Sequence, residues 1–146
     1  MNLSDLTLIV AAGGKSTRMG QDKRFLPLDG ELLLARTLRK GRAAGFRSIV
    51  LAAEEAREEL TILAAEFGAI LVTDEIPAQG PAAAIAAGLS AAETEWSLVL
   101  SADMPFYDIE LVRALLPHAE GDTQVVLPTL SDYWQPLAAL YRRDAG

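Results

Sequence analysis

The segment LTLIVAAGGKSTRMGQDK, residues 6–23, joins a short apolar run to a pair of glycines and then to a cluster of cations. The apolar run, Leu6–Ala11, predicts a buried strand. Gly13 and Gly14 follow at a place where the backbone must approach another group closely or adopt a positive φ. A buried strand that ends in a glycine turn is typical of α/β proteins, so the fold depends on whether similar strands follow.

Five more apolar segments predict strands, and predicted helices separate most of them. The predicted strands are 48–53, 69–73, 96–102, 124–127 and 137–141, and the predicted helices are 31–44, 56–67, 80–92 and 109–116. A brief extended piece, 24–28, precedes an Asp29–Gly30 turn. The strands are apolar throughout rather than alternating, which indicates a mostly parallel sheet covered on both faces. We therefore predict an α/β fold, a three-layer αβα sandwich, with residues 1–146 forming one domain.

The composition excludes several classes of function. The 146 residues include no cysteine, which excludes disulfides, thiolate catalysis and cysteine-ligated metals. No apolar run approaches the ~20 residues that cross a bilayer, and the N-terminus lacks the basic start of a signal peptide. The net charge of -7 weighs against nucleic-acid binding. We expect a cytoplasmic protein with no membrane and no nucleic-acid partner.

The charge is unevenly distributed along the chain. Residues 1–47 hold nine Lys and Arg against four Asp and Glu, whereas residues 48–146 hold four against sixteen. The cations between Arg36 and Arg47 are explained as the solvated face and last turn of a helix. The cations that follow the glycine pair are not, and they indicate an anionic ligand bound early in the chain.

The segment after the glycine pair has the features of a phosphate-binding loop. The amides of Lys15, Ser16 and Thr17 are expected in a bend after the glycine pair, and such a row of amides can form an anion nest. The spacing is neither G-x-G-x-x-G nor a Walker loop. Arg18 and Lys23 on the same loop add the charge that a polyphosphate requires. Ligands of parallel sheets bind beyond the carboxyl ends of the strands, where this loop is expected.

Four segments carry a resemblance to a known family. AAGGKSTRMGQDK, residues 11–23, resembles the signature of the molybdenum cofactor guanylyltransferases, the MobA-like nucleotidyltransferases. Three later segments are similar to others of that family: VTDEIPAQGPAAAIAAGL (72–89), LVLSADMPF (98–106) and YWQPLAALYRRD (133–144). The resemblance implies a nucleotidyltransferase with a Rossmann-like fold. Family members are usually longer, so residues 1–146 are expected to lack the family's C-terminal segment.

The resemblance also implies a reaction. GMP would pass from GTP to the terminal phosphate of a molybdenum-pterin cofactor, with release of pyrophosphate. A phosphate monoester has a second pKa of ~6, so the nucleophile is already ionised and needs no general base. This agrees with a chain whose one histidine, His118, follows a predicted helix. The reaction needs cancellation of negative charge, which preorganised amides and cations supply.

The charge-cancelling groups are assigned to the glycine loop. The backbone amides predicted to bind the β- and γ-phosphates are those of Gly13, Gly14, Lys15 and Ser16. Arg18 is placed on the same oxygens, and Lys23 is placed near the α-phosphate, where charge grows in the transition state. The structural alternatives are an ion pair with Asp22 for Arg18 and a solvated side chain for Lys23.

Asp103 is the predicted metal ligand and the third predicted catalytic residue. It leaves the strand predicted over 96–102 directly before Met104 and Pro105. Magnesium takes hard oxygen ligands, often one or two carboxylates with phosphate oxygens. The alternative role for Asp103 is a helix N-cap or an Asx-turn before the proline. Asp108 is the better candidate for the N-cap, because a helical pattern starts right after it. A second metal ligand is expected in the family's C-terminal segment.

Guanine recognition is assigned by the resemblance alone. In the family, the backbone after the first strand, an Asp after the third strand and a Gly-Pro loop surround the base. The matching residues are Ala11, Ala12, Asp74, Gly80 and Pro81. An Asp accepts from both the N1–H and the 2-amino group of guanine. The alternative for Asp74 is a turn former. The family often has Asn after the second strand, where this chain has LAAEEA, residues 51–56.

Two other functions stay open on the sequence. One is an enzyme of the same fold that uses CTP or another phosphorylated acceptor, which the absent Asn favours. The other is a domain that binds nucleotide or delivers cofactor without catalysis. The joint presence of Arg18, Lys23 and Asp103 counts against the second. The protein partners implied are cofactor-synthesis proteins or molybdoenzyme chaperones.

Overall fold

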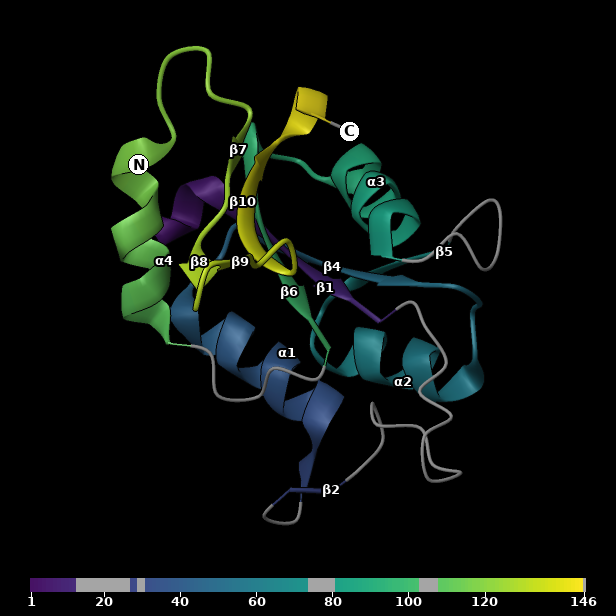
Figure 1. Ribbon diagram of the computed structural model, residues 1–146. Coiled ribbons are helices and arrows are strands. Elements are labelled where there is room, and N and C mark those ends of the chain that lie inside the picture. Colours follow the sequence, from purple (N-terminus) through teal and green to yellow (C-terminus); the bar gives the residue numbers. More distant parts are fainter. Residues whose placement is uncertain (13–26, 29–30, 74–80, 103–107, 146) are drawn as a thin grey trace.

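The computed structural model describes residues 1–12, 27–28, 31–73, 81–102 and 108–145. Its main sheet has six strands: β1 (Leu6–Ala11), β4 (Ser48–Ala53), β5 (Ile70–Thr73), β6 (Trp96–Ser101), β7 (Val125–Val126) and β10 (Ala138–Arg142). They lie in the order β5-β4-β1-β6-β10-β7 (Figure 1). The first four are parallel, and β10 runs antiparallel to both β6 and β7.

Helices cover both faces of this sheet. They are α1 (Leu33–Ala44), α2 (Glu58–Glu66), α3 (Pro81–Ala91) and α4 (Ile109–Leu115). Buried side chains of α1, α2 and α4 form one core with Leu6, Leu8 and Val10 of β1. Ala84 and Leu89 of α3 form a second core with the other face of the sheet. Figure 1 shows α3 on the opposite side of the sheet from α1 and α2. The predicted α/β fold with a mostly parallel sheet between two helical layers is confirmed.

The position of β1 explains its uniformly apolar sequence. All six of its residues are buried, because both faces and both edges of the strand are covered. Thr7 is its one polar residue, and the Thr7 hydroxyl lies 3.0 Å from the Ser48 hydroxyl and 2.7 Å from the Thr94 hydroxyl. These bonds satisfy the hydroxyl group in a buried position.

Two short hairpins differ from the sequence prediction. The helix predicted over 31–44 begins at Leu33, because Glu31–Leu32 forms β3, which pairs antiparallel with β2 (Pro27–Leu28). A second hairpin joins β8 (Thr129–Leu130) to β9 (Tyr133–Trp134), where no strands are predicted. Strands of two residues are too short for a periodic pattern to show. Short 3-10 helices complete the described elements: Leu3–Asp5, Leu116–His118 and Arg143–Ala145.

The helix boundaries follow from local chemistry. Gly45 ends α1 in the left-handed region, with φ of 88°, where a side chain would be strained. The Asp108 side chain accepts a hydrogen bond from the Glu110 amide at 2.9 Å, so Asp108 is the N-cap of α4 as predicted. The edge strand β5 is less covered than predicted for a buried strand, and Ile70 is 41% exposed.

Candidate functional site

The candidate site lies at the edge of the sheet where β1, β4, β5 and β6 end. The register aligns Ala11 of β1 with Ser101 of β6, and Ala53 of β4 with Thr73 of β5. Since these strands are parallel, their carboxyl ends meet at one edge. The loops that carry most of the predicted site residues therefore start from neighbouring positions.

Two backbone hydrogen bonds extend the sheet beyond the last strand residues. The Ala12 amide donates to the Ala52 carbonyl at 2.7 Å, and the Ala102 amide donates to the Ala11 carbonyl at 3.0 Å. Ala12 immediately precedes the glycine pair, and Ala102 immediately precedes Asp103. The phosphate-loop prediction and the metal-ligand prediction thus begin at adjacent points of the fold.

The connections between the parallel strands reverse direction at β1, which makes the carboxyl end of β1 a topological switch point. From β1 the chain moves outward to β4 and then to β5, after which it returns to β6 on the other side of β1. In open α/β sheets, ligands bind in the crevice outside the carboxyl ends of the strands at such a switch. The crevice expected here lies between the exits of β1 and β6.

Three of the predicted site residues are described. Ala11 and Ala12 are 7% and 2% exposed, so their side chains belong to the core and only their backbone can face a ligand. Pro81 is exposed and is the first residue of α3. A proline fits this position because the first residue of a helix donates no hydrogen bond within the helix. The other predicted residues lie outside the described residues: Gly13, Gly14, Lys15, Ser16, Arg18, Lys23, Asp74, Gly80 and Asp103. For these residues, the structure shows only the ends of the strands and the helix that flank them in the sequence.

Acidic residues follow β4 at this edge. Glu54 is half-buried and Glu55 is exposed, in the segment where the family resemblance suggests Asn. Carboxylates repel a polyphosphate, so cations for an anionic ligand must come from elsewhere. Among the described residues, no group of three or more His, Cys, Asp or Glu side chains is arranged to hold a metal ion.

The segment between β9 and β10 also reaches this edge, and no site role was predicted for it. The Ser101 amide donates to the Leu137 carbonyl at 3.2 Å, which places residue 137 beside the exit of β6. The Tyr141 hydroxyl donates to the Pro136 carbonyl at 2.8 Å and so ties the preceding turn to β10. Burial raises the pKa of Tyr141 above its ordinary value. The sequence signal for this segment was its similarity to the family motif that contains Gln135 and Pro136.

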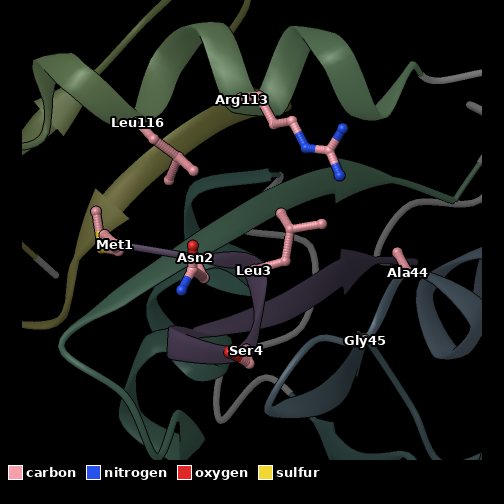
Figure 2. Close-up of a pocket in the computed structure, with 8 residues that line it drawn as sticks. All are labelled: Met1, Asn2, Leu3, Ser4, Ala44, Gly45, Arg113 and Leu116. Carbon is pink, nitrogen blue, oxygen red and sulfur yellow. The ribbon is translucent and has the colours of Figure 1, made fainter.

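A pocket of about 390 Å³ lies at the opposite edge of the sheet. Its lining includes Asn2 and Leu3, which precede β1, together with Gly45, which precedes β4 (Figure 2). Arg113 of α4 also lines the pocket, and its guanidinium is paired with Glu110 at 2.6 Å. This pocket lies at the amino ends of the strands and is separate from the candidate site. Within the described ranges, no helix is both long enough and apolar enough to span a membrane.

The fold and the switch-point edge define an α/β protein of the Rossmann-like class. Residues 8–146 match the model of the MobA-like NTP transferase domain, and the chain belongs to this family. The protein is a nucleotidyltransferase. The family prediction and the enzyme-class prediction are confirmed.

Relatives of this chain cover nearly all of it. A probable molybdenum cofactor guanylyltransferase of Natronomonas pharaonis is 33% identical over 143 residues, which are 97% of this chain and 70% of that protein. Another from Opitutus terrae is 37% identical over 151 residues, covering 99% of this chain and 70% of the relative. The crystal structure of molybdopterin-guanine dinucleotide biosynthesis protein A from Archaeoglobus fulgidus superimposes with a TM-score of 0.77 at 26% identity. That match covers 96% of this chain and 69% of the other.

Proposed function

We propose that this nucleotidyltransferase moves GMP from GTP to the terminal phosphate of a molybdenum-pterin cofactor and releases pyrophosphate. The observation that carries the proposal is the hydrogen bond from the Ala102 amide to the Ala11 carbonyl. It sets the exit that leads to Asp103 beside the exit that leads to the glycine loop. The names of the relatives from Natronomonas pharaonis and Opitutus terrae support the choice of GTP and of a molybdenum cofactor.

The glycine loop binds the triphosphate in this proposal. Amides of residues 13–16 point at the β- and γ-phosphates, and Arg18 adds a planar fork of donors to the same oxygens. Lys23 lies near the α-phosphate, which the nucleophile attacks. Its ammonium group stabilises the charge that accumulates there as the pyrophosphate leaves. The acceptor phosphate is ionised at neutral pH, so no residue of the chain acts as its base.

Asp103 is the proposed ligand of a magnesium ion. A single carboxylate at the strand exit, together with phosphate oxygens of the substrate, fits the hard oxygen ligands that Mg²⁺ takes at nucleotide sites. When bound, the ion neutralises charge on the transferring phosphate. Residue 103 directly follows Ala102, whose amide donates to the Ala11 carbonyl at the end of the core strand β1.

Base recognition falls on the other side of β1. Asp74 directly follows β5 in the sequence, and Gly80 directly precedes Pro81, the first residue of α3. Helix α3 packs against β1, β4 and β5. An Asp carboxylate in this place would accept from the N1–H and 2-amino groups of guanine. The Glu54–Glu55 pair in place of the family's Asn favours one competitor, an enzyme of the same fold that uses CTP.

A nucleotide panel tests the proposal. Bound at about 100 times its Kd, GTP with Mg²⁺ stabilises the native state by about 2.7 kcal/mol. For a chain of this size, that corresponds to a rise in melting temperature of roughly 5–10 °C. GTP should also support pyrophosphate release when molybdenum-loaded pterin is present. Equal shifts from CTP or ATP would contradict the guanine assignment.

The metal assignment has its own test. Asp103→Asn should retain GTP affinity within a few-fold while pyrophosphate release is abolished. Asp122→Asn makes the same chemical change at an exposed turn between α4 and β7, and should leave the rate unchanged. An active Asp103→Asn enzyme would show that the carboxylate holds no catalytic ion.

A further inference from the structure

The β8–β9 hairpin presents a cluster of exposed apolar side chains. Leu130, Tyr133 and Trp134 are 69%, 75% and 67% exposed, more than any other large apolar side chain in the described part of the chain. Isolated exposed apolar residues are common, but three on one six-residue hairpin, residues 129–134, mark a contact surface. Tyrosine and tryptophan are also the residues most enriched where proteins recognise ligands.

The hairpin is a defined structure rather than an open loop. Leu130 pairs with Tyr133, and Thr129 pairs with Trp134. The two turn residues, Ser131 and Asp132, have φ values of 50° and 68°. Consecutive left-handed residues are typical of the two-residue type I′ turn, which normally uses Asn and Gly. Non-glycine residues in this conformation are strained, and such strain is concentrated at functional sites.

The base of the hairpin adjoins the candidate site. The Gln135 amide donates to the Pro128 carbonyl at 2.9 Å and closes the hairpin. Two residues later, Leu137 accepts from the Ser101 amide at the end of β6. The hairpin therefore leaves the sheet at the edge where β1 and β6 end, on the β10 side of β6 (Figure 1).

The strand order assigns the parts of the reaction to different sections of this edge. In the proposed function, on which this inference rests, the base lies over β4 and β5, the phosphates lie over β1, and the metal carboxylate follows β6. The nucleophile attacks the α-phosphate from the side opposite the leaving pyrophosphate. The acceptor must therefore bind at a part of the edge that the nucleotide does not occupy. The remaining section of the edge is that of β10 and β7, the two strands that the hairpin connects.

We propose that Trp134 forms a stacking surface for the flat pyrimidine part of the acceptor's pterin ring. Successive strand residues point to opposite faces, so Trp134 shares a face with Thr129, and Tyr133 shares the other face with Leu130. The Thr129–Trp134 pair is the one nearer the hairpin base and hence nearer the exit of β6. Stacking on the indole ring would hold the heterocycle of the acceptor without charged contacts. The phosphate of the acceptor would then be bound by the cations proposed for the site.

Intrinsic fluorescence gives a readout that needs no turnover. The chain has two tryptophans, and the other, Trp96, is 5% exposed. Iodide should quench Trp134 in the free protein, and Trp134→Phe should remove the quenched component. A phosphorylated pterin used as the probe should protect Trp134 from iodide, whereas GTP with Mg²⁺ should not. Unchanged quenching at saturating pterin would overturn the proposal.

Steady-state kinetics tests the same contact with matched variants. Trp134→Ala should raise the KM for the acceptor about ten-fold, as expected for loss of one aromatic stacking contact, with the KM for GTP unchanged. Trp134→Phe keeps an aromatic ring and should leave the KM for the acceptor close to the wild-type value. Tyr133→Ala is the control, because Tyr133 is an aromatic residue on the opposite face that is at least as exposed as Trp134, and it should have little effect. Equal effects of the two alanine variants would overturn the assignment to Trp134.

The failures of the two proposals are distinguishable. Absence of any GTP-dependent stabilisation or pyrophosphate release refutes the proposed function. Normal GTP turnover with an unchanged acceptor KM in Trp134→Ala refutes the stacking surface alone. Protection of Trp134 that grows with protein concentration, in the absence of pterin, would identify a second copy of the chain as the occupant and would also overturn the proposal.

Discussion

Gly88 allows α3 to lie directly against β1, and replacing it with alanine should separate them. A Cβ atom added at Gly88 would lie 2.5 Å from Ile9 Cγ2 and 3.1 Å from Ile9 Cδ1. Ile9 is fully buried in the central strand, and Cγ2 is bonded directly to its Cβ. This methyl group therefore cannot move away by rotation of a long side chain. The relief must come from a shift of α3 or of the strand.

The size of the effect follows from two opposing terms. Overpacking of a well-packed core costs about 1–3 kcal/mol. Replacement of glycine by alanine inside a helix returns about 1 kcal/mol. The net cost is therefore about 0–2 kcal/mol. Because the Ile9 methyl cannot rotate away, we expect Gly88→Ala to lie near the upper end and to lower the free energy of unfolding by about 2 kcal/mol, or roughly 4–8 °C in melting temperature. Because α3 begins at Pro81, the same shift should weaken GTP binding several-fold.

Urea unfolding followed by circular dichroism measures this cost. Gly41→Ala is the matched control: its added Cβ would lie 2.4 Å from Leu8 Cδ2, a terminal methyl that can rotate away. Gly41→Ala should therefore cost less than Gly88→Ala. Ile9→Ala removes the clashing methyl group and should be less damaging in the Gly88→Ala background than in the wild type. A Gly88→Ala protein as stable as the wild type, with no coupling to Ile9, would refute the reasoning.

Three further substitutions have defined outcomes. Lys23→Ala should lower kcat for pyrophosphate release more than it raises the KM for GTP, because the proposed mechanism uses its charge mainly in the transition state; the reverse pattern would place it in ground-state binding. Asp108→Ala should lower the free energy of urea unfolding by about 1 kcal/mol through loss of the hydrogen bond to the Glu110 amide, and an unchanged value would show that this cap contributes nothing. Tyr141→Phe should reduce the loss of stability above pH 10. Burial raises the pKa of Tyr141 above 10.0, so this tyrosine ionises in the unfolded chain at a lower pH than in the folded protein. The folded state therefore loses stability as the pH rises above 10, and Tyr141 makes no such contribution below pH 10. Unfolding at pH 8 and pH 11 measures this, and equal slopes for both proteins would contradict it.

The strands were predictable because burial on both faces leaves a continuous apolar run. Leu6–Ala11 and Ser48–Ala53 have the predicted bounds, and both are covered by helices on each side. The β8–β9 hairpin was not predictable, because its strands have two residues each and its turn lacks the usual Asn-Gly pair. Its aromatic side chains also offer no periodic signal, since both faces of the hairpin are exposed.

For the candidate site, the sequence predicts which positions along the chain contribute residues, and it does not predict how those positions meet in the fold. A strand followed by Gly13 and Gly14 marks a binding edge, and Asp103 after another apolar strand marks a second point. That the two exits are neighbours depends on the strand order, which places β6 next to β1 although β4 and β5 intervene in the sequence. Long-range pairing of this kind is set by packing of the whole sheet, and no local pattern encodes it. The position of Leu137 beside the end of β6 could not be predicted for the same reason.

The central claim is that one polyphosphate is bound between the exits of β1 and β6. A crystal structure of the chain with GTP and Mg²⁺ tests it most directly. The account predicts a triphosphate held by the amides of residues 13–16, with Arg18 and Lys23 on its oxygens and the metal ion on Asp103. A nucleotide bound elsewhere, or side chains of Arg18 and Lys23 directed away from the pocket that Asp103 lines, would contradict it.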